Sequence, residues 1–254
     1  MPETTEPQTL PRTGGATIAY HRLSGKTPGV VFLGGFGSDM TGTKALAVEA
    51  FCKTRGHACL RFDYQGHGQS SGDFTDGTIG SWTEDALAAF DACTEGPQVL
   101  VGSSMGGWIM LLVALARKDR VAGLLGIAAA PDFTEDLIGE KLNAAQRAAL
   151  ARDGFFDVAS DDAETPTRIT QKLIEEGKAH LLLRQAIPLD CPVWLLHGMA
   201  DADVPWETSL RLLNRLQSDD VTATFIRHGD HRLSGEDDIR RLEQTLGALL
   251  DSVA

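Results

Sequence analysis

Gly102-Ser103-Ser104-Met105-Gly106 fits the pattern G-x-S-x-G, and the sequence on either side of it fits as well. A short apolar run at residues 98–101 precedes the motif and predicts a buried strand. A longer apolar run at residues 108–116 follows it and predicts a buried helix. Strand, tight turn and helix in this order are the context of a nucleophile elbow, which presents a serine hydroxyl at the edge of a sheet.

The two glycines of the motif have a steric purpose. A tight elbow brings backbone against backbone, and Gly102 and Gly106 leave space where a side chain would clash. Ser104 would then stand at the start of the next helix, where backbone N–H groups stabilise a developing negative charge. An ordinary Gly/Ser turn between a strand and a helix is the alternative interpretation. Only residues elsewhere in the chain can distinguish it from a nucleophile elbow.

Strand-like and helix-like segments alternate over most of the chain. The alternation predicts one α/β domain over residues 1–254, with a doubly wound, mostly parallel sheet covered by helices on both faces. Residues 1 to about 15 are expected to form a loose tail, and residues 17–22 an edge strand. The further predicted strands are 30–33, 58–62, 121–129, 193–197 and 221–226, and the further predicted helices are 44–54, 81–93 and 239–250.

One segment, from about residue 132 to 188, breaks this alternation. It contains no strand-like run, and it shows helical patterns at 141–152 and 167–178. Helices inserted after a strand would lie over the carboxyl edge of the sheet, as a small helical cap above Ser104. Packing on the flank of the sheet is the alternative.

A serine nucleophile needs a base, and the base needs an orienting acid. In doubly wound hydrolases the acid and then the histidine follow the serine along the chain. The turn after the strand at 193–197 offers Asp201 and Asp203. The spacing D-x-x-V-P favours Asp201 as the acid, because Val204 and Pro205 begin the next segment and Asp203 could cap its helix.

Two histidines compete for the role of base. His231 falls in the loop after the last predicted strand, whereas His228 lies at the end of that strand and is expected to be structural. His231 is therefore the predicted base. His197, at the end of the strand before Asp201, is expected to bond to a neighbouring loop, and His67 has no context that points to a catalytic role.

An oxyanion hole needs two N–H donors that point at the tetrahedral oxygen. The backbone N–H of Met105, the residue after the serine, is one candidate. The loop Gly34-Gly35-Phe36-Gly37 follows the first buried strand, and the N–H of Phe36 is the second candidate. A phosphate-binding loop is a weaker interpretation of these glycines, because the lysine and hydroxyl residues of a P-loop and the full G-x-G-x-x-G pattern are missing.

Net charge, cysteine spacing and hydrophobicity restrict the classes of partner and cofactor that we expect. The formal net charge of −12 argues against nucleic acid or an anionic membrane surface as the main partner. The four cysteines form no C-x-x-C pair and have no zinc-ligand spacing, so we expect neither a metal nor a cofactor. No run reaches the roughly 20 apolar residues of a membrane span, and the first residues lack a secretory or organelle-targeting pattern, which together predict a cytoplasmic protein.

These residues resemble the α/β-hydrolase superfamily, and within it a subgroup that includes a mitochondrial palmitoyl-protein thioesterase of animals, which is also described as an acyl-glucuronide esterase. The resemblance covers most of the core and implies a triad at Ser104, Asp201 and His231. The segment 132–188 matches least, so the substrates of the animal protein transfer poorly. The matching stretches lie at residues 42–47, 51–53, 56–64, 101–108, 191–192, 195–199, 204–206 and 230–232.

The sequence therefore predicts a serine hydrolase that cleaves esters or thioesters through an acyl-enzyme on Ser104. S-palmitoyl thioesters and acyl glucuronides, on small molecules or acylated proteins, are the substrates that the resemblance implies. Hydrolysis of carbon–carbon or amide bonds, or perhydrolysis, with the same triad is the alternative, because fold and triad do not fix the chemistry. A non-catalytic binding protein on this fold would need a broken triad or a blocked pocket. Oligomeric state cannot be read from the sequence.

Overall fold

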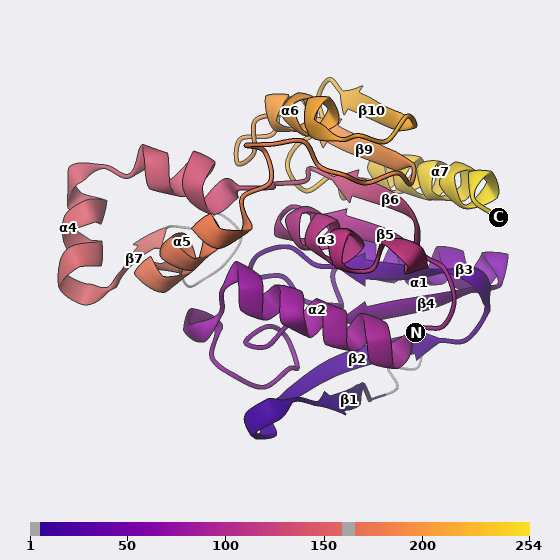
Figure 1. Cartoon of the computed structure of the whole chain (residues 1–254), viewed down its shortest axis with the longest axis horizontal. Helices are drawn as coiled ribbons and strands as arrows, with labels where there is room; N and C mark the ends of the chain where they lie inside the picture. Colours follow the sequence, from indigo (N-terminus) through magenta and orange to yellow (C-terminus); the bar gives the residue numbers. More distant parts are fainter. Residues whose placement is uncertain (1–5, 159–165) are drawn as a thin grey trace.

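An eight-stranded sheet runs through the molecule in the order β1-β2-β4-β3-β5-β6-β9-β10 (Figure 1). The computed structural model describes residues 6–158 and 166–254. Neighbouring strands from β4 to β10 in this order are parallel, whereas β1 pairs with β2 and β2 with β4 in antiparallel fashion. The strands are β1 (Gln8–Pro11), β2 (Thr17–Leu23), β3 (Lys26–Leu33), β4 (His57–Phe62), β5 (Gln98–Ser103), β6 (Val121–Ile127), β9 (Val193–Gly198) and β10 (Val221–Ile226).

Helices cover both faces of this sheet. Buried side chains of α1 and α7 pack on one face, and those of α2, α3 and α6 pack on the other. Strand β5 shows the division, since Val99 and Val101 point to the first layer and Leu100 to the second. The predicted doubly wound α/β fold is thereby confirmed. The helices are α1 (Thr43–Arg55), α2 (Ile79–Cys93), α3 (Met105–Ala116), α6 (Glu207–Arg215) and α7 (Glu236–Ser252).

The N-terminal prediction was wrong at one point. Residues 1 to 15 were expected to be loose, but β1 lies within them and pairs with β2, so β2 is not the edge strand. The reason is that a four-residue, mostly exposed strand has almost no hydrophobic pattern of its own, and its backbone pairing is supplied by β2. Residues 1–5 of the expected tail lie outside the described residues.

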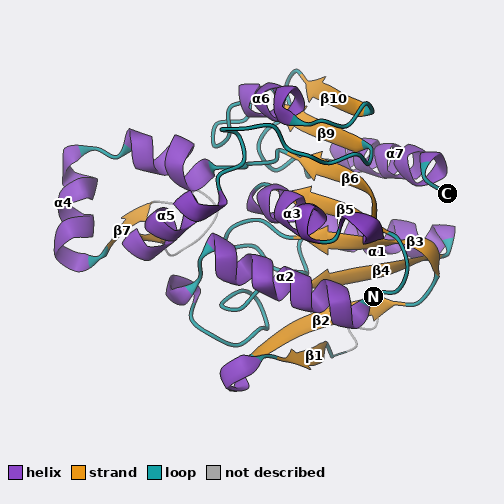
Figure 2. Ribbon diagram, viewed as in Figure 1, coloured by secondary structure: helices purple, strands orange, loops and turns teal. Residues whose placement is uncertain are grey.

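The segment 132–188 lies beyond the carboxyl ends of the parallel strands, on the side where their arrowheads point in Figure 1. It contains α4 (Ala144–Asp153) and α5 (Gln171–Gly177), as the helical patterns predict. The expectation that it has no strand was wrong, because β7 (Phe155–Val158) and β8 (Thr167–Thr170) form a small antiparallel pair (Figure 2). Each strand has only four residues, too few to show a period-two pattern. Residues 159–165 of this segment lie outside the described part.

Polar contacts tie the two ends of this segment together. Asp132 is completely buried, and its carboxylate accepts the backbone N–H groups of Leu182 and Leu183 at 2.7 and 2.9 Å. Burial raises the pKa of Asp132, although these bonds and the nearby Arg184 act in the opposite direction. The indole N–H of Trp108, in the core helix α3, donates to the carbonyl of His180 at 3.0 Å. The segment is thus fixed to the sheet domain at its base.

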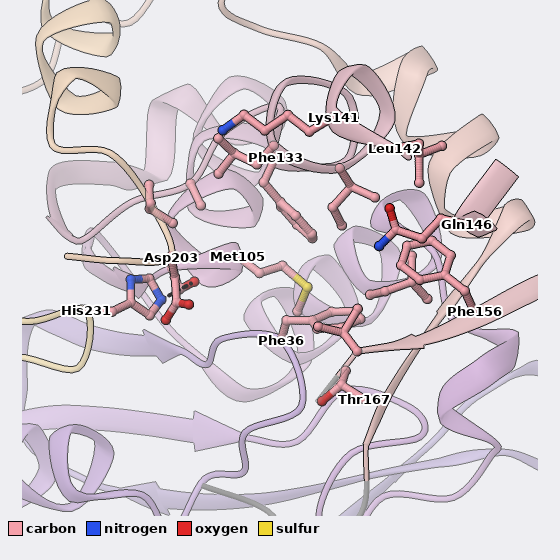
Figure 3. Close-up of a pocket in the computed structure, with 17 residues that line it drawn as sticks. Phe36, Met105, Phe133, Lys141, Leu142, Gln146, Phe156, Thr167, Asp203 and His231 are labelled. Atoms are coloured by element: carbon pink, nitrogen blue, oxygen red, sulfur yellow. Dashed lines mark hydrogen bonds between the residues drawn. The ribbon is translucent and has the colours of Figure 1, made fainter. Parts of the chain in front are cut away.

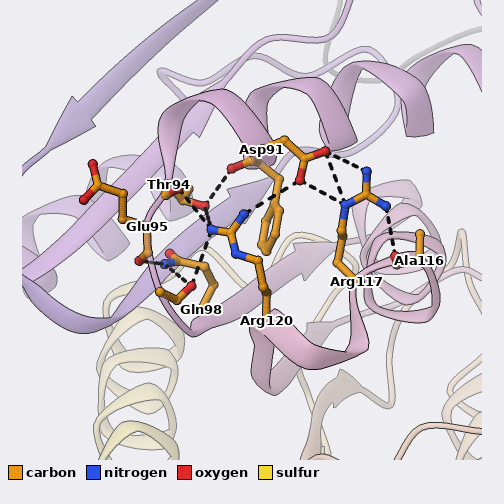
Figure 4. A network of polar contacts seen from close by, with 9 residues as sticks. Asp91, Thr94, Glu95, Gln98, Ala116, Arg117 and Arg120 are labelled. Atoms are coloured by element: carbon orange, nitrogen blue, oxygen red, sulfur yellow. Dashed lines mark hydrogen bonds and ion pairs between the residues drawn. The ribbon is translucent and has the colours of Figure 1, made fainter.

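A second polar network joins helices at the opposite, amino-terminal edge of the sheet (Figure 4). Arg117, at the end of α3, forms an ion pair with Asp91 of α2 at 2.6 Å. Arg120, just before β6, donates to the carbonyl and hydroxyl oxygens of Thr94 and lies over the ring of Phe90 at 4.5 Å. These contacts link the ends of α2 and α3 far from Ser104, and exposed pairs of this kind contribute little stability individually.

None of the helices in the described part of the chain has the length and hydrophobicity that a membrane span requires. Among the described cysteines, Cys52, Cys59 and Cys93 are buried and Cys191 is half-buried, and all four are free thiols.

Candidate active site

Ser104 sits between β5 and α3 in a strained backbone conformation. Its φ of 55° and ψ of −120° belong to a region that residues with side chains rarely adopt, at a cost of about 1–3 kcal/mol. Three backbone bonds hold it there: its N–H donates to Ile127 at 2.9 Å, and its carbonyl accepts from Gly107 at 2.9 Å and Ala130 at 3.0 Å. Strand β6 and helix α3 therefore fix the serine in the geometry that the G-x-S-x-G motif predicts.

The two glycines of the motif lie where backbone segments touch. A Cβ on Gly102 would come within 2.4 Å of the Gly106 carbonyl oxygen. A Cβ on Gly106 would come within 2.1 Å of the Leu33 carbonyl oxygen, at the end of β3. These distances are impossible for a real side chain, so the elbow requires glycine at both positions.

Ser104, His231 and Asp201 form a hydrogen-bonded row. His231 Nε2 lies 3.0 Å from Ser104 Oγ, and His231 Nδ1 lies 2.7 Å from Asp201 Oδ2. Because a carboxylate only accepts, Nδ1 carries the proton and the bare Nε2 accepts the serine hydroxyl. This is the arrangement in which a histidine removes a proton from serine.

Asp201 is held as an anion. Its side chain is completely buried, which raises its pKa, but hydrogen bonds outweigh this and bring the pKa well below the ordinary value. His197 and His231 bond to Oδ2, and the backbone N–H groups of Asp203 and Val204 donate to Oδ1 at 2.9 and 2.8 Å.

The competing residues lie elsewhere in the site. Asp203 is exposed and does not cap α6, which begins at Glu207 with no side-chain cap, so the expected capping role was wrong. Its carboxylate instead lies beside His231 in the cavity (Figure 3). His228 is exposed in the turn after β10.

Asp201, Asp203 and His231 also make up the one group of metal-ligand side chains in the described part of the chain whose ligand atoms lie within 4.8 Å of one another. Asp201 already accepts four hydrogen bonds, and His231 Nδ1 carries the proton of one of them. The group therefore fits a proton-transfer site better than a metal site.

The two expected oxyanion donors flank Ser104. Met105 is the first residue of α3, where a backbone N–H has no partner inside the helix. Phe36 lies in the turn after β3, and a Cβ on the neighbouring Gly35 would lie 3.3 Å from Ser104 Cβ. The turn therefore lies directly beside Ser104.

His67 supports this turn, a role that its sequence context did not indicate. Its Nε2 accepts the N–H of Gly37 at 3.2 Å, and its Nδ1 faces the carbonyl of Gln65 at 3.3 Å. Burial lowers the pKa of His67 to about 4, so the ring is neutral and Nε2 remains an acceptor at physiological pH. Only the folded structure brings residues 37 and 67 together.

A cavity of about 630 Å³ opens from Ser104 toward the segment 132–188 (Figure 3). This volume lies within the range of small-molecule sites. Phe36 lines it, whereas Trp108 is buried in the core and Trp206 packs on Phe225, so these tryptophans are not its walls. Most of its lining residues come from the segment, which contributes the polar Lys141, Gln146 and Thr167 and a larger number of apolar side chains: Phe133, Leu137, Ile138, Leu142, Phe156, Val158 and Ile169.

A second cavity, of about 470 Å³, opens on another side of the same serine. It shares Phe36, Ser104, Thr167, Asp203 and His231 with the first cavity. Its other walls combine the charged side chains of Asp39, Lys44 and Arg232 with small or apolar residues such as Gly35, Phe32 and Ala45. Ser104 and His231 thus lie where the two cavities meet.

Comparison with known proteins gives consistent matches. The family model described as "Alpha/beta hydrolase family" matches residues 30–245. Human palmitoyl-protein thioesterase ABHD10, mitochondrial, is 42% identical over 238 residues, which span 93% of this chain and 78% of the relative. The structure of alpha/beta hydrolase domain-containing protein 10 from mouse matches with a TM-score of 0.91 and 41% identity, over 98% of this chain and 100% of that one. A structure from Agrobacterium vitis S4 matches with a TM-score of 0.93 and 42% identity, over 98% and 100%.

These matches confirm the resemblance stated from the sequence and correct one expectation. The cytoplasmic location is contradicted, because relatives from human, orangutan and cattle are named as mitochondrial proteins. Targeting peptides are short segments whose sequence is independent of the fold, so the lack of a recognisable targeting pattern does not establish where a protein is located.

Proposed function

The chain belongs to the alpha/beta hydrolase family, and on that premise we propose that it cleaves carboxylic esters or thioesters through an acyl-enzyme on Ser104. The observation that carries the proposal is the hydrogen-bonded row Ser104–His231–Asp201 on a strained elbow. The name of the relatives, palmitoyl-protein thioesterase, supports S-acyl thioesters as the leading substrate class.

The proposed reaction follows from the hydrogen bonds. Ser104 Oγ attacks the acyl carbonyl while His231 Nε2 takes its proton, and Asp201 stabilises the imidazolium through Nδ1. The N–H groups of Phe36 and Met105 bind the oxyanion, an effect worth about 10²–10³ in kcat for one donor. His231 then protonates the departing thiolate or alkoxide, and water activated by the same nitrogen releases the acid.

We assign the two cavities to the two halves of the substrate. The first cavity, where aromatic and aliphatic side chains of the segment 132–188 gather, takes the acyl chain, and that segment acts as the cap of a single domain. An apolar cavity of about 150 Å³ holds benzene, with its six carbons. On that scale, 630 Å³ accommodates roughly two dozen non-hydrogen atoms, enough for a long acyl chain. The second cavity, which the charged side chains of Asp39, Lys44 and Arg232 line, takes the leaving group, either a small thiol or a cysteine-containing peptide.

Covalent labelling tests which residue is the nucleophile. A fluorophosphonate probe should label Ser104 in the folded protein, as located by mass spectrometry of the labelled peptide. Ser104→Ala should abolish labelling and lower kcat on an S-octanoyl thioester by at least about 10⁴-fold. Ser103→Ala, which removes the adjacent hydroxyl of the same motif, should retain labelling. Labelling of Ser104→Ala at the wild-type rate would refute the assignment.

A substrate panel tests the bond that is cleaved. We expect turnover of S-acyl thioesters and p-nitrophenyl esters of the same acyl chain, and none of the matching anilide or β-diketone. Turnover of the anilide or diketone alone would replace ester cleavage by amide or carbon–carbon bond hydrolysis.

A further inference from the structure

His197, the penultimate residue of β9, lies behind the proposed acid and is completely buried. Its Nδ1 lies 2.7 Å from the hydroxyl of Ser209, in α6. Its Nε2 lies 3.0 Å from the carbonyl oxygen of Val204 and 3.2 Å from Asp201 Oδ2. The ring therefore connects α6, the turn after β9 and the carboxylate that orients His231.

The partners determine where the protons lie on this ring. The carbonyl of Val204 and the carboxylate of Asp201 can only accept, so Nε2 carries a hydrogen that both share. In the neutral ring Nδ1 is then bare and accepts the hydroxyl hydrogen of Ser209. Ser209 is only 1% exposed, so no solvent competes for this bond.

Asp201 Oδ2 consequently has two histidine partners. It accepts from Nδ1 of His231 on the substrate side and from Nε2 of His197 on the core side. The backbone N–H groups of the turn donate to the other oxygen, Oδ1. His197 is thus the one group in the described residues, apart from His231 itself, that donates to the oxygen on which the orientation of His231 depends.

We propose that His197 is a positioning residue, which extends the row to Ser209–His197–Asp201–His231–Ser104. It helps the two backbone N–H groups on Oδ1 to hold the carboxylate plane in which Oδ2 faces His231, and it spreads part of the negative charge of Asp201. This inference rests on the proposed hydrolase function. Without the bond from His197, only the bonds to Oδ1 restrain the carboxylate plane from the core side, and the more concentrated charge on Oδ2 attracts the imidazolium of His231 more strongly.

Two amide substitutions separate the roles of the two ring nitrogens. The side-chain nitrogen of Gln reaches the position of Nε2, so His197→Gln retains a donor to Asp201. His197→Asn reaches only the position of Nδ1 and retains the contact with Ser209. We expect His197→Asn to lower kcat about 10- to 100-fold with little change in KM. We also expect it to move the acid limb of the kcat/KM profile upward by about half a pH unit or more. His197→Gln should restore most of both.

Two features of this experiment exclude other causes of a changed pH profile. The charged groups Asp203, Lys44 and Arg232 line the cavities with His231, and Asp230 precedes it; all of them are unchanged in these variants. His57→Asn is the matched control, because His57 is also a buried histidine, bonded to the carbonyl of Pro28 at the opposite edge of the sheet. It should lower the melting temperature without moving the pH profile.

The readouts distinguish failure of this inference from failure of the proposed function. The role of His197 is refuted if the wild type hydrolyses the thioester through Ser104 while the Asn and Gln variants share one kcat and one pH profile. If neither variant folds, Ser209→Ala replaces them, and an unmoved acid limb in that variant overturns the proposal equally. A wild type that neither labels nor turns over refutes the hydrolase function itself.

Discussion

The substitution Gly106→Ala tests the close contact on which the elbow depends. Gly106 is the second residue of α3, and an added Cβ would lie 2.1 Å from the carbonyl oxygen of Leu33 and 2.5 Å from that of Gly34. Carbon and carbonyl oxygen approach in proteins to about 3.3 Å. The end of β3 and the start of α3 must therefore separate by about 1 Å, and this moves Phe36 away from Ser104.

The magnitude follows from two opposing terms. Overpacking a buried site costs about 1–3 kcal/mol, while alanine in place of glycine inside a helix returns up to about 1 kcal/mol. The two terms together give a net loss of at most about 3 kcal/mol, and a value in the middle of that range, about 1–2 kcal/mol, lowers the melting temperature of a chain of this size by about 2–8 °C. Activity should suffer more than stability, because a misplacement of about 1 Å costs roughly 10²-fold in rate.

The assay compares kcat/KM on a p-nitrophenyl ester with the melting temperature for two matched variants. Gly247→Ala is the control, since Gly247 is also a buried glycine inside a helix, α7, and its added Cβ would meet side chains alone, the ring of Phe51 at 3.3 Å and the guanidinium of Arg55 at 3.7 Å. This control should keep full activity and lose little or no stability. If Gly106→Ala retained wild-type kcat/KM, the inference that this contact aligns the oxyanion loop with Ser104 would be wrong.

Three further perturbations follow from buried carboxylates and from the cavity. Asp132→Ala leaves the N–H groups of Leu182 and Leu183 without their acceptor, and should cost about 2–6 kcal/mol in urea denaturation at pH 7, at 1–3 kcal/mol for each donor. Folding lowers the pKa of Asp201, so the stabilisation that Asp201 contributes is complete above the ordinary pKa of about 4 and declines as the pH falls below that value. The wild type should therefore lose more free energy of unfolding between pH 5 and 3 than the Asp201→Asn variant loses. Equal losses would contradict this prediction. Leu142→Trp should fill part of the first cavity and lower kcat/KM for dodecanoyl esters at least tenfold while sparing acetyl esters, whereas a uniform loss would place the acyl chain elsewhere.

The elbow could be predicted from sequence because its determinants are local. The strand, the two glycines and the helix all lie within the motif or directly beside it. Each of them produces its own steric or hydrophobic pattern in the sequence. Asp201 and His231 are separated from Ser104 by about a hundred residues, but each follows a strand of a parallel sheet. Because carboxyl ends of parallel strands meet at one edge, the order of strands was enough to expect the three side chains together.

The specific partners of His67 and His197 could not be predicted in this way, although His197 does bond to the neighbouring loop, as expected, through the carbonyl of Val204. Neither side chain differs in pattern from a structural histidine, since their significance depends on which acceptor or donor the fold places beside them. His67 meets the N–H of Gly37, thirty residues away, and His197 meets Ser209 across a turn. A hydrogen-bond partner in another element leaves no periodicity in the sequence, so only coordinates can identify it.

The segment 132–188 was the least predictable part for a related reason. Its own core is small, formed by Leu150, Phe156, Ile169 and Ile174, and the ends of the segment pack into the main core through Phe133, Leu182 and Ile187. Hydrophobic periodicity reports burial of long elements on a large core, so short elements around a small separate core give a weak signal. Ten of the residues that line the first cavity belong to this segment, whereas the elbow is held by β3, β6 and α3. If the segment binds the acyl chain, as proposed, substitutions in it can change substrate preference without disturbing the elbow.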